Sequence, residues 1–145
     1  MSGDPKTHLT GDFAKKIEDF RPHVVIFSTV VEDTWPQAKE MLQVLKSYPE
    51  IKTLLGGVFT TMAPEMVIRS PLVQSIGYGE GEATILEFCE NVRQGLPTTH
   101  IPSTWSKNEN GKIIRNLSRP LVDLDATIPD FSLFDERRFL RPLGA

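Results

Sequence analysis

The chain has 145 residues, of which 39% are hydrophobic and 24% are charged, so its size and balance are those of one folded soluble domain. Its formal net charge of -3 provides no basic field for a phosphate backbone, which argues against nucleic acid binding. No apolar run is long enough to span a membrane and the polar start contains no signal peptide, so we expect a cytoplasmic protein.

The first part of the chain, residues 1–97, alternates between helical and strand patterns. Helices are predicted over residues 12–20, 33–48, 64–69 and 82–94, and strands over residues 23–30, 51–55 and 73–76. Asp33 or Thr34 can cap the second helix, and Gly95 is placed to end the last one. The first strand is almost unbroken in hydrophobicity, which is typical of a parallel strand covered on both faces.

The pattern changes after Pro97. The pair Asn110-Gly111 is a strong hairpin signal, so residues 98–117 are predicted to form a small two-stranded flap. Residues 118–145 show no sustained period and are predicted to be a linker with a short helix near residues 135–139.

Alternating strands and helices with short links predict an open α/β sheet, in which ligands bind beyond the carboxyl ends of the strands. Small or polar residues gather at those ends, and the candidate site consists of Ser28, Thr29, Val30, Gly56, Gly57, Gly77, Gly79, Glu80 and Gly81. Glycines let a flat or bulky ligand approach the backbone, and hydroxyls offer hydrogen bonds. The same glycines can instead serve only to make tight turns, and both interpretations stay open at this point.

The sequence indicates no catalytic residue and no metal ligand. The single cysteine, Cys89, cannot form an internal disulfide or hold an iron-sulfur cluster, and on the apolar face of its helix it is best interpreted as a small hydrophobe. The three histidines, His8, His23 and His100, share no spacing that is typical of a metal site.

Three short motifs follow one another along the chain: Ser28-Thr29-Val30, then Gly56-Gly57, then a glycine loop over residues 77–82. In order and spacing they resemble the cobalamin-binding domain of B12-dependent radical SAM enzymes, and within that group the anaerobic magnesium-protoporphyrin IX monomethyl ester cyclases. The resemblance runs from about Phe13 to the C-terminus, where residues 119–134 are similar to the linker that enters the radical SAM barrel.

The resemblance implies a partial flavodoxin-like sheet, of which this chain supplies strands 3, 4 and 5, and it implies cobalamin as the cofactor. Ser28 and Thr29 would hydrogen-bond the base of the nucleotide loop, Gly56 and Gly57 would leave room for it, and residues 77–82 would line the same cleft. The run Phe59-Thr60-Thr61 departs from the His-Pro-Thr or His-Ala-Thr run of many relatives.

The resemblance also implies a longer parent enzyme, an oxidative cyclase or a methyltransferase, that holds a [4Fe-4S] cluster and S-adenosylmethionine. The cysteine motif for that cluster would follow Ala145, so this chain alone is expected to catalyse nothing.

Strands 1 and 2 of the flavodoxin-like sheet are expected to lie outside this chain. The edge of residues 24–30 would then be exposed, and unpaired edges recruit partners. We therefore expect the chain to form a homodimer through this edge or to cover it with its own N-terminus.

Two rival interpretations remain. A receiver-like interaction module would carry an acceptor aspartate at a first strand end, where this chain has Val30 and Val31. A nucleotide-binding half domain would use Gly56-Gly57, but Glu80 and Glu82 would put negative charge beside a pyrophosphate.

Overall fold

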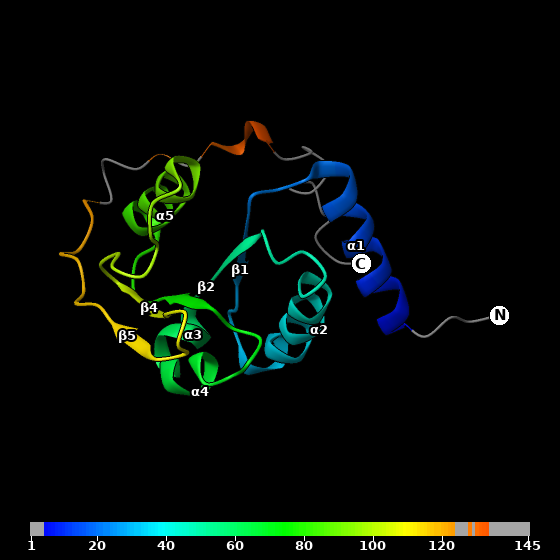
Figure 1. Cartoon of the computed structure of the whole chain (residues 1–145), viewed down its shortest axis with the longest axis horizontal. Helices are drawn as coiled ribbons and strands as arrows, with labels where there is room; N and C mark the ends of the chain where they lie inside the picture. The colour runs from blue at the N-terminus through cyan, green and yellow to red at the C-terminus, as the bar shows by residue number, and fades with distance from the viewer. Residues whose placement is uncertain (1–4, 124–127, 129, 134–145) are drawn as a thin grey trace, which may run out of the picture.

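The structure, a computed structural model, describes residues 5–123, 128 and 130–133 (Figure 1). Its elements follow in the order α1 (Pro5–Phe20), β1 (Val24–Ser28), η1 (Glu32–Thr34), α2 (Trp35–Leu45), β2 (Lys52–Gly56), α3 (Val58–Met62), α4 (Pro64–Ile68), β3 (Ser75–Gly77), α5 (Glu82–Gln94), β4 (Thr104–Lys107), β5 (Ile113–Arg115) and η3 (Phe131–Leu133). No helix among these described segments is long and apolar enough to cross a membrane.

One sheet organises the domain, with its strands in the order β1-β2-β3-β4-β5. β1, β2 and β3 are parallel, with Phe27 opposite Leu55 and Leu55 opposite Ile76. β4 then pairs antiparallel with β3, and β5 antiparallel with β4. The predicted open α/β sheet, parallel over β1, β2 and β3, is therefore confirmed. The hairpin extends this sheet and is not a separate flap.

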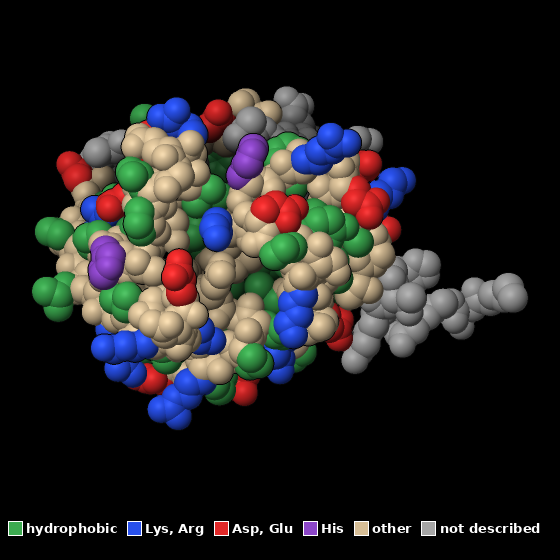
Figure 2. Space-filling model, viewed as in Figure 1, with side chains coloured by type: hydrophobic (Ala, Val, Ile, Leu, Met, Phe, Trp, Pro, Cys, Tyr) green, Lys and Arg blue, Asp and Glu red, His purple; other side chains and the backbone are tan. Residues whose placement is uncertain are grey.

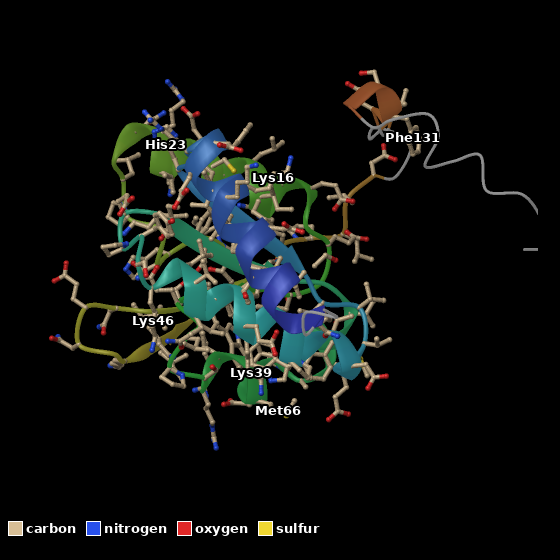
Figure 3. The ribbon with its side chains drawn as sticks, turned by 90° about the vertical axis from the view of Figure 1, so that its right-hand side faces the viewer. Lys16, His23, Lys39, Lys46, Met66 and Phe131 are labelled. Atoms are coloured by element: carbon tan, nitrogen blue, oxygen red, sulfur yellow. The ribbon has the colours of Figure 1, made fainter. Side chains whose placement is uncertain are left out.

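Helices cover both faces of the sheet. α1, α2 and α4 share the larger core cluster with Phe27, Leu55 and Ile76, and Figure 3 shows α1 lying across α2 on this face. On the other face α5 packs through Phe88 against Leu54, and Figure 1 shows it across the sheet from α2. α2 and α4 lie in the two crossovers between parallel strands, which run in the same direction along the sheet, so a right-handed sense places both helices on one face.

The predicted end of α5 is confirmed, whereas the predicted cap of α2 is not. α5 ends at Gly95, whose φ of 69° is the left-handed conformation of a helix C-cap, and the Leu96 amide donates to the carbonyl of Asn91. α2 begins after Thr34, but the Thr34 hydroxyl donates to the carbonyl of Val31 and makes no capping bond. Thr34 therefore closes the preceding turn.

The prediction that the first strand is covered on both faces holds only in part. β1 is an edge strand of the sheet in the described part of the chain; Val24 packs against Leu54 and Phe88 on the α5 side, but Ile26 is 39% exposed. Phe27 is buried on the opposite face, where its ring centroid lies 6.2 Å from that of Phe13 in α1. α1 thus packs on a face of β1 and does not pair with its edge. The helix predicted near residues 135–139 lies outside the described residues.

Candidate functional site

A cavity of about 250 Å³ opens at the carboxyl ends of β1, β2 and β3. Its walls are mainly apolar or glycine, and they consist of Ile26, Phe27, Ser28, Leu54, Gly56, Gly57, Gly77, Gly79, Glu80, Gly81, Thr84 and Ile85. The structure therefore brings together, around one cavity, seven of the nine residues that the sequence singles out. Thr29 and Val30 are the two that do not line it.

The pleat of β1 explains which residues reach the cavity. Successive side chains of a strand point to opposite faces, so Ile26 and Ser28 share the α5 face, where the cavity opens. Thr29 lies on the same face of the sheet as Phe27 and is only 1% exposed. Its side chain lies in the core, so the expected contact of Thr29 with a ligand has no support from this placement. Val30 is exposed beyond the strand end.

The Thr29 hydroxyl holds two strand ends together. Its Oγ1 donates to the carbonyl oxygen of Gly56 at 2.9 Å and lies 2.7 Å from the buried Thr60 Oγ1. A hydroxyl has one proton, so when Thr29 donates to Gly56, Thr60 must donate to Thr29. The Thr29 amide also donates to the Gly56 carbonyl. Thr29 and Thr60 thus fix the backbone of the cavity wall from behind.

The two adjacent glycines have different roles. At Gly57 φ is 99°, and a Cβ there would lie 2.5 Å from the Thr29 carbonyl oxygen, so this position excludes every side chain for reasons of backbone packing. At Gly56 a Cβ would meet only the Gly77 carbonyl oxygen, at 3.8 Å. Gly56 therefore leaves open space that a flat ligand group could occupy.

The loop over residues 77–82 is held from two sides. Its Gly79 amide donates to Thr61 Oγ1 at 3.1 Å, and the Thr61 hydroxyl itself donates to the carbonyl of Gly57. On the other side, the Glu80 carboxylate accepts a hydrogen bond from the Val122 amide at 2.6 Å. Thr61 belongs to the run 59–61 that differs from many relatives, and it links α3 to this loop.

Sequence reasoning missed five residues of the wall: Ile26, Phe27, Leu54, Thr84 and Ile85. They belong to the strand interiors and to the first turn of α5, whereas the predicted site contained only strand ends and the loop after them. The alternation of β1 and the position of α5 directly after the glycine loop are the signals that could have identified them.

The residues that line the cavity are suited to binding a ligand. Among the described residues there is no group of three or more His, Cys, Asp and Glu side chains that could hold a metal ion. The cavity wall consists of apolar side chains and glycine backbone together with Ser28, Thr84 and Glu80, which suit a flat, largely apolar group with a few polar atoms.

Residues 4–88 match the B12 binding domain family. The chain is 26% identical over 132 residues to the anaerobic magnesium-protoporphyrin IX monomethyl ester cyclase of Rubrivivax gelatinosus, which covers 87% of this chain and 24% of that protein. It is 23% identical over 112 residues to the cytidylyl-2-hydroxyethylphosphonate methyltransferase of Streptomyces wedmorensis, covering 77% of this chain and 21% of that protein.

Two solved structures have a similar fold. The cobalamin-dependent S-adenosylmethionine radical enzyme OxsB, with aqua-cobalamin and S-adenosylmethionine bound, superposes with a TM-score of 0.63 at 20% identity and covers 77% of this chain and 16% of its own. The radical S-adenosylmethionine methyltransferase TsrM of Kitasatospora setae superposes with a TM-score of 0.61 at 20% identity, covering 79% and 22%.

The chain thus spans less than a quarter of the length of each of these relatives. The family match includes β1, β2 and β3 and the first part of α5, which together surround the cavity. The chain therefore belongs to the B12 binding domain family, and its fold is similar to part of the radical S-adenosylmethionine enzymes OxsB and TsrM.

Proposed function

We propose that the cavity between β1, β2 and the 77–82 loop is the place where this chain holds cobalamin. The observation that carries the proposal is the coincidence of a family match with an open space above Gly56, bounded by Ser28 and the glycine loop. Ser28 supplies a hydroxyl for a polar ligand atom, and Ile26, Leu54 and Ile85 supply the apolar walls.

The volume of the cavity defines how much of the cofactor it can take. Sites that enclose a drug-sized ligand measure roughly 300 to 1,000 Å³. At about 250 Å³ this cavity suits one flat group of a larger molecule, such as the base of the nucleotide loop. The corrin ring would then lie outside the cavity.

An absorbance titration of the chain with hydroxocobalamin tests this proposal. Gly56→Leu fills the open space without a positive φ to strain the backbone, so we expect its Kd to rise about tenfold or more. Gly11→Leu is the matched control, because Gly11 lies exposed in α1 and a Cβ there would meet no atom within 4 Å. Equal affinity of all three proteins would place the site elsewhere. No saturable binding by the wild type would overturn the proposal and favour a cofactor-free interaction module.

We further propose that the chain belongs to a longer radical SAM enzyme of the oxidative cyclase or methyltransferase type. The names of the relatives support this, since they include a cyclase, a methyltransferase and two radical S-adenosylmethionine enzymes. In such a protein a [4Fe-4S] cluster and S-adenosylmethionine would be held outside this chain, and residues 118–145 would link to that part. Activity of the intact gene product with S-adenosylmethionine, with and without cobalamin, is the test.

We also propose that β1 pairs with β1 of a second copy. In the described part of the chain β1 has one strand neighbour, β2, and its Ile26 is partly exposed. A two-fold axis at the middle of an antiparallel β1 pair would place the two Ile26 residues near each other. Ile26→Lys should therefore convert a dimer to a monomer in light scattering, because like charges would oppose each other. Leu86→Lys, at an exposed position of α5, is the control, and a monomeric wild type would contradict the proposal.

A cytoplasmic location and the lack of nucleic acid binding remain predictions. The net charge of -3 supports the second, and in Figure 2 acidic and basic side chains lie interspersed over the face in view. A gel-shift assay at low salt would test it.

A further inference from the structure

The segment that follows the hairpin lies against the wall of the proposed cofactor site. The Ser103 amide donates to the carbonyl of Leu117 at 2.8 Å, and the Arg119 amide donates to Ser103 Oγ at 2.9 Å. Further along the segment, the Val122 amide donates to the Glu80 carboxylate at 2.6 Å. The Arg119 guanidinium also pairs with Glu87 of α5. Residues 117–122 are thus fixed at four points.

Ser103 connects this segment to the glycine loop. Its carbonyl accepts a hydrogen bond from the Tyr78 amide at 3.0 Å, so its amide, carbonyl and hydroxyl are all used. Ser103 is only 5% exposed and has a φ of 61°, a left-handed conformation that is unfavourable for a residue other than glycine. Residues keep such a conformation when the surrounding contacts over-determine it.

We propose that residues 117–122 form a strap that sets the position of the 77–82 loop, and that Glu80 is a positioning residue of the cofactor site. The inference rests on the proposed function of the cavity. The loop is attached to α3 through Gly79 and Thr61, to Ser103 and Asn116 through Tyr78, and to the strap through Glu80 and Val122. A displacement of the strap would therefore be transmitted to this wall through the contact between Val122 and Glu80.

The Val122 amide offers a clean test of the strap. Val122→Pro removes the N–H that donates to the Glu80 carboxylate, whereas Val122→Ala keeps it, and Val122 itself does not line the cavity. In the hydroxocobalamin titration we expect Val122→Pro and Glu80→Ala each to raise the Kd roughly threefold or more, and Val122→Ala to bind as the wild type does. A Glu80→Ala effect with no difference between the two Val122 variants would overturn the strap, because Glu80 would then act on the ligand directly.

Hydrogen exchange of the free chain separates this inference from the proposed function. If the strap positions the loop, amides of residues 78–82 should exchange faster in Val122→Pro and Glu80→Ala than in Val122→Ala, whether or not cobalamin binds. Equal exchange in all variants would overturn the strap. If the wild type does not bind cobalamin but the variants show this pattern of exchange, the proposed cobalamin site would be refuted and the strap would stand.

Discussion

Gly57 packs directly against the backbone of Thr29. A Cβ at position 57 would lie 2.5 Å from the Thr29 carbonyl oxygen and 2.8 Å from its nitrogen, and φ at Gly57 is 99°. This contact closes the ends of β1 and β2 behind the cavity wall. A bulky substitution at Gly57 would therefore damage the fold before it could block a ligand, which is why Gly56 is the better probe of the site.

Gly57→Ala should destabilise the protein strongly. With ψ at 176°, the conformation of Gly57 belongs to a region that is essentially restricted to glycine, and the added Cβ would collide with backbone. We expect a loss of about 3 kcal/mol or more in the free energy of unfolding, measured by urea denaturation. Gly11→Ala, in the exposed interior of α1, should instead gain roughly 0.5 to 1 kcal/mol. A similar small change at both sites would contradict the assigned contact.

The hydroxyls of Thr29 and Thr60 should show coupled contributions to stability. Both side chains are buried, and Thr29 Oγ1 contacts Thr60 Oγ1 and the Gly56 carbonyl. Replacing either threonine by valine leaves a buried partner without its hydrogen bond, so each single variant should lose about 1 to 3 kcal/mol. The double variant should lose less than the sum of the two, because it removes both members of the pair. Additive losses in urea denaturation would show that the hydroxyls do not interact.

The sequence predicted the individual elements of the fold well because each of them depends on local pattern. α5 occupies residues 82–94 as its apolar face and Gly95 indicate, and the Asn110-Gly111 turn lies between β4 and β5. The pairing of β4 with β3 joins distant segments, and no local pattern specifies it. α3 has five residues and is too short for helical periodicity to be recognised.

The site was predicted less completely, because the sequence alone does not show which face of the sheet each residue of β1 occupies. Ser28 and Thr29 are adjacent polar residues, and sequence alone offered both as ligand contacts. The face of each residue becomes certain only when the packing of Phe27 against Phe13 is known. Thr29 then belongs to the core and Ser28 to the cavity.

Lys107 should stabilise the junction between the parallel and antiparallel strands. Its Nζ donates to the carbonyl of Ser70 at 2.6 Å and to that of Val73 at 2.9 Å, while burial lowers the pKa of the lysine. Lys107→Met keeps the apolar stem but leaves both carbonyls without this donor, so we expect a loss of about 1 to 3 kcal/mol in urea denaturation. Lys112→Met, at an exposed position of the same hairpin, should change stability little. Equal effects would assign no structural role to the Lys107 ammonium.

Replacing Arg21 by glycine should stabilise the protein. It follows the last residue of α1 with a φ of 50°, and its amide donates to the Ile17 carbonyl at 2.8 Å, as in a helix C-cap. The left-handed conformation is unfavourable for arginine, so Arg21→Gly should raise the free energy of unfolding by roughly 0.5 to 1 kcal/mol after the entropy of glycine is deducted. Arg21→Ala removes the same side chain but keeps a Cβ, so it should give no such gain. If alanine stabilised the protein as much as glycine in thermal unfolding, the benefit would come from the loss of the guanidinium and not from the backbone.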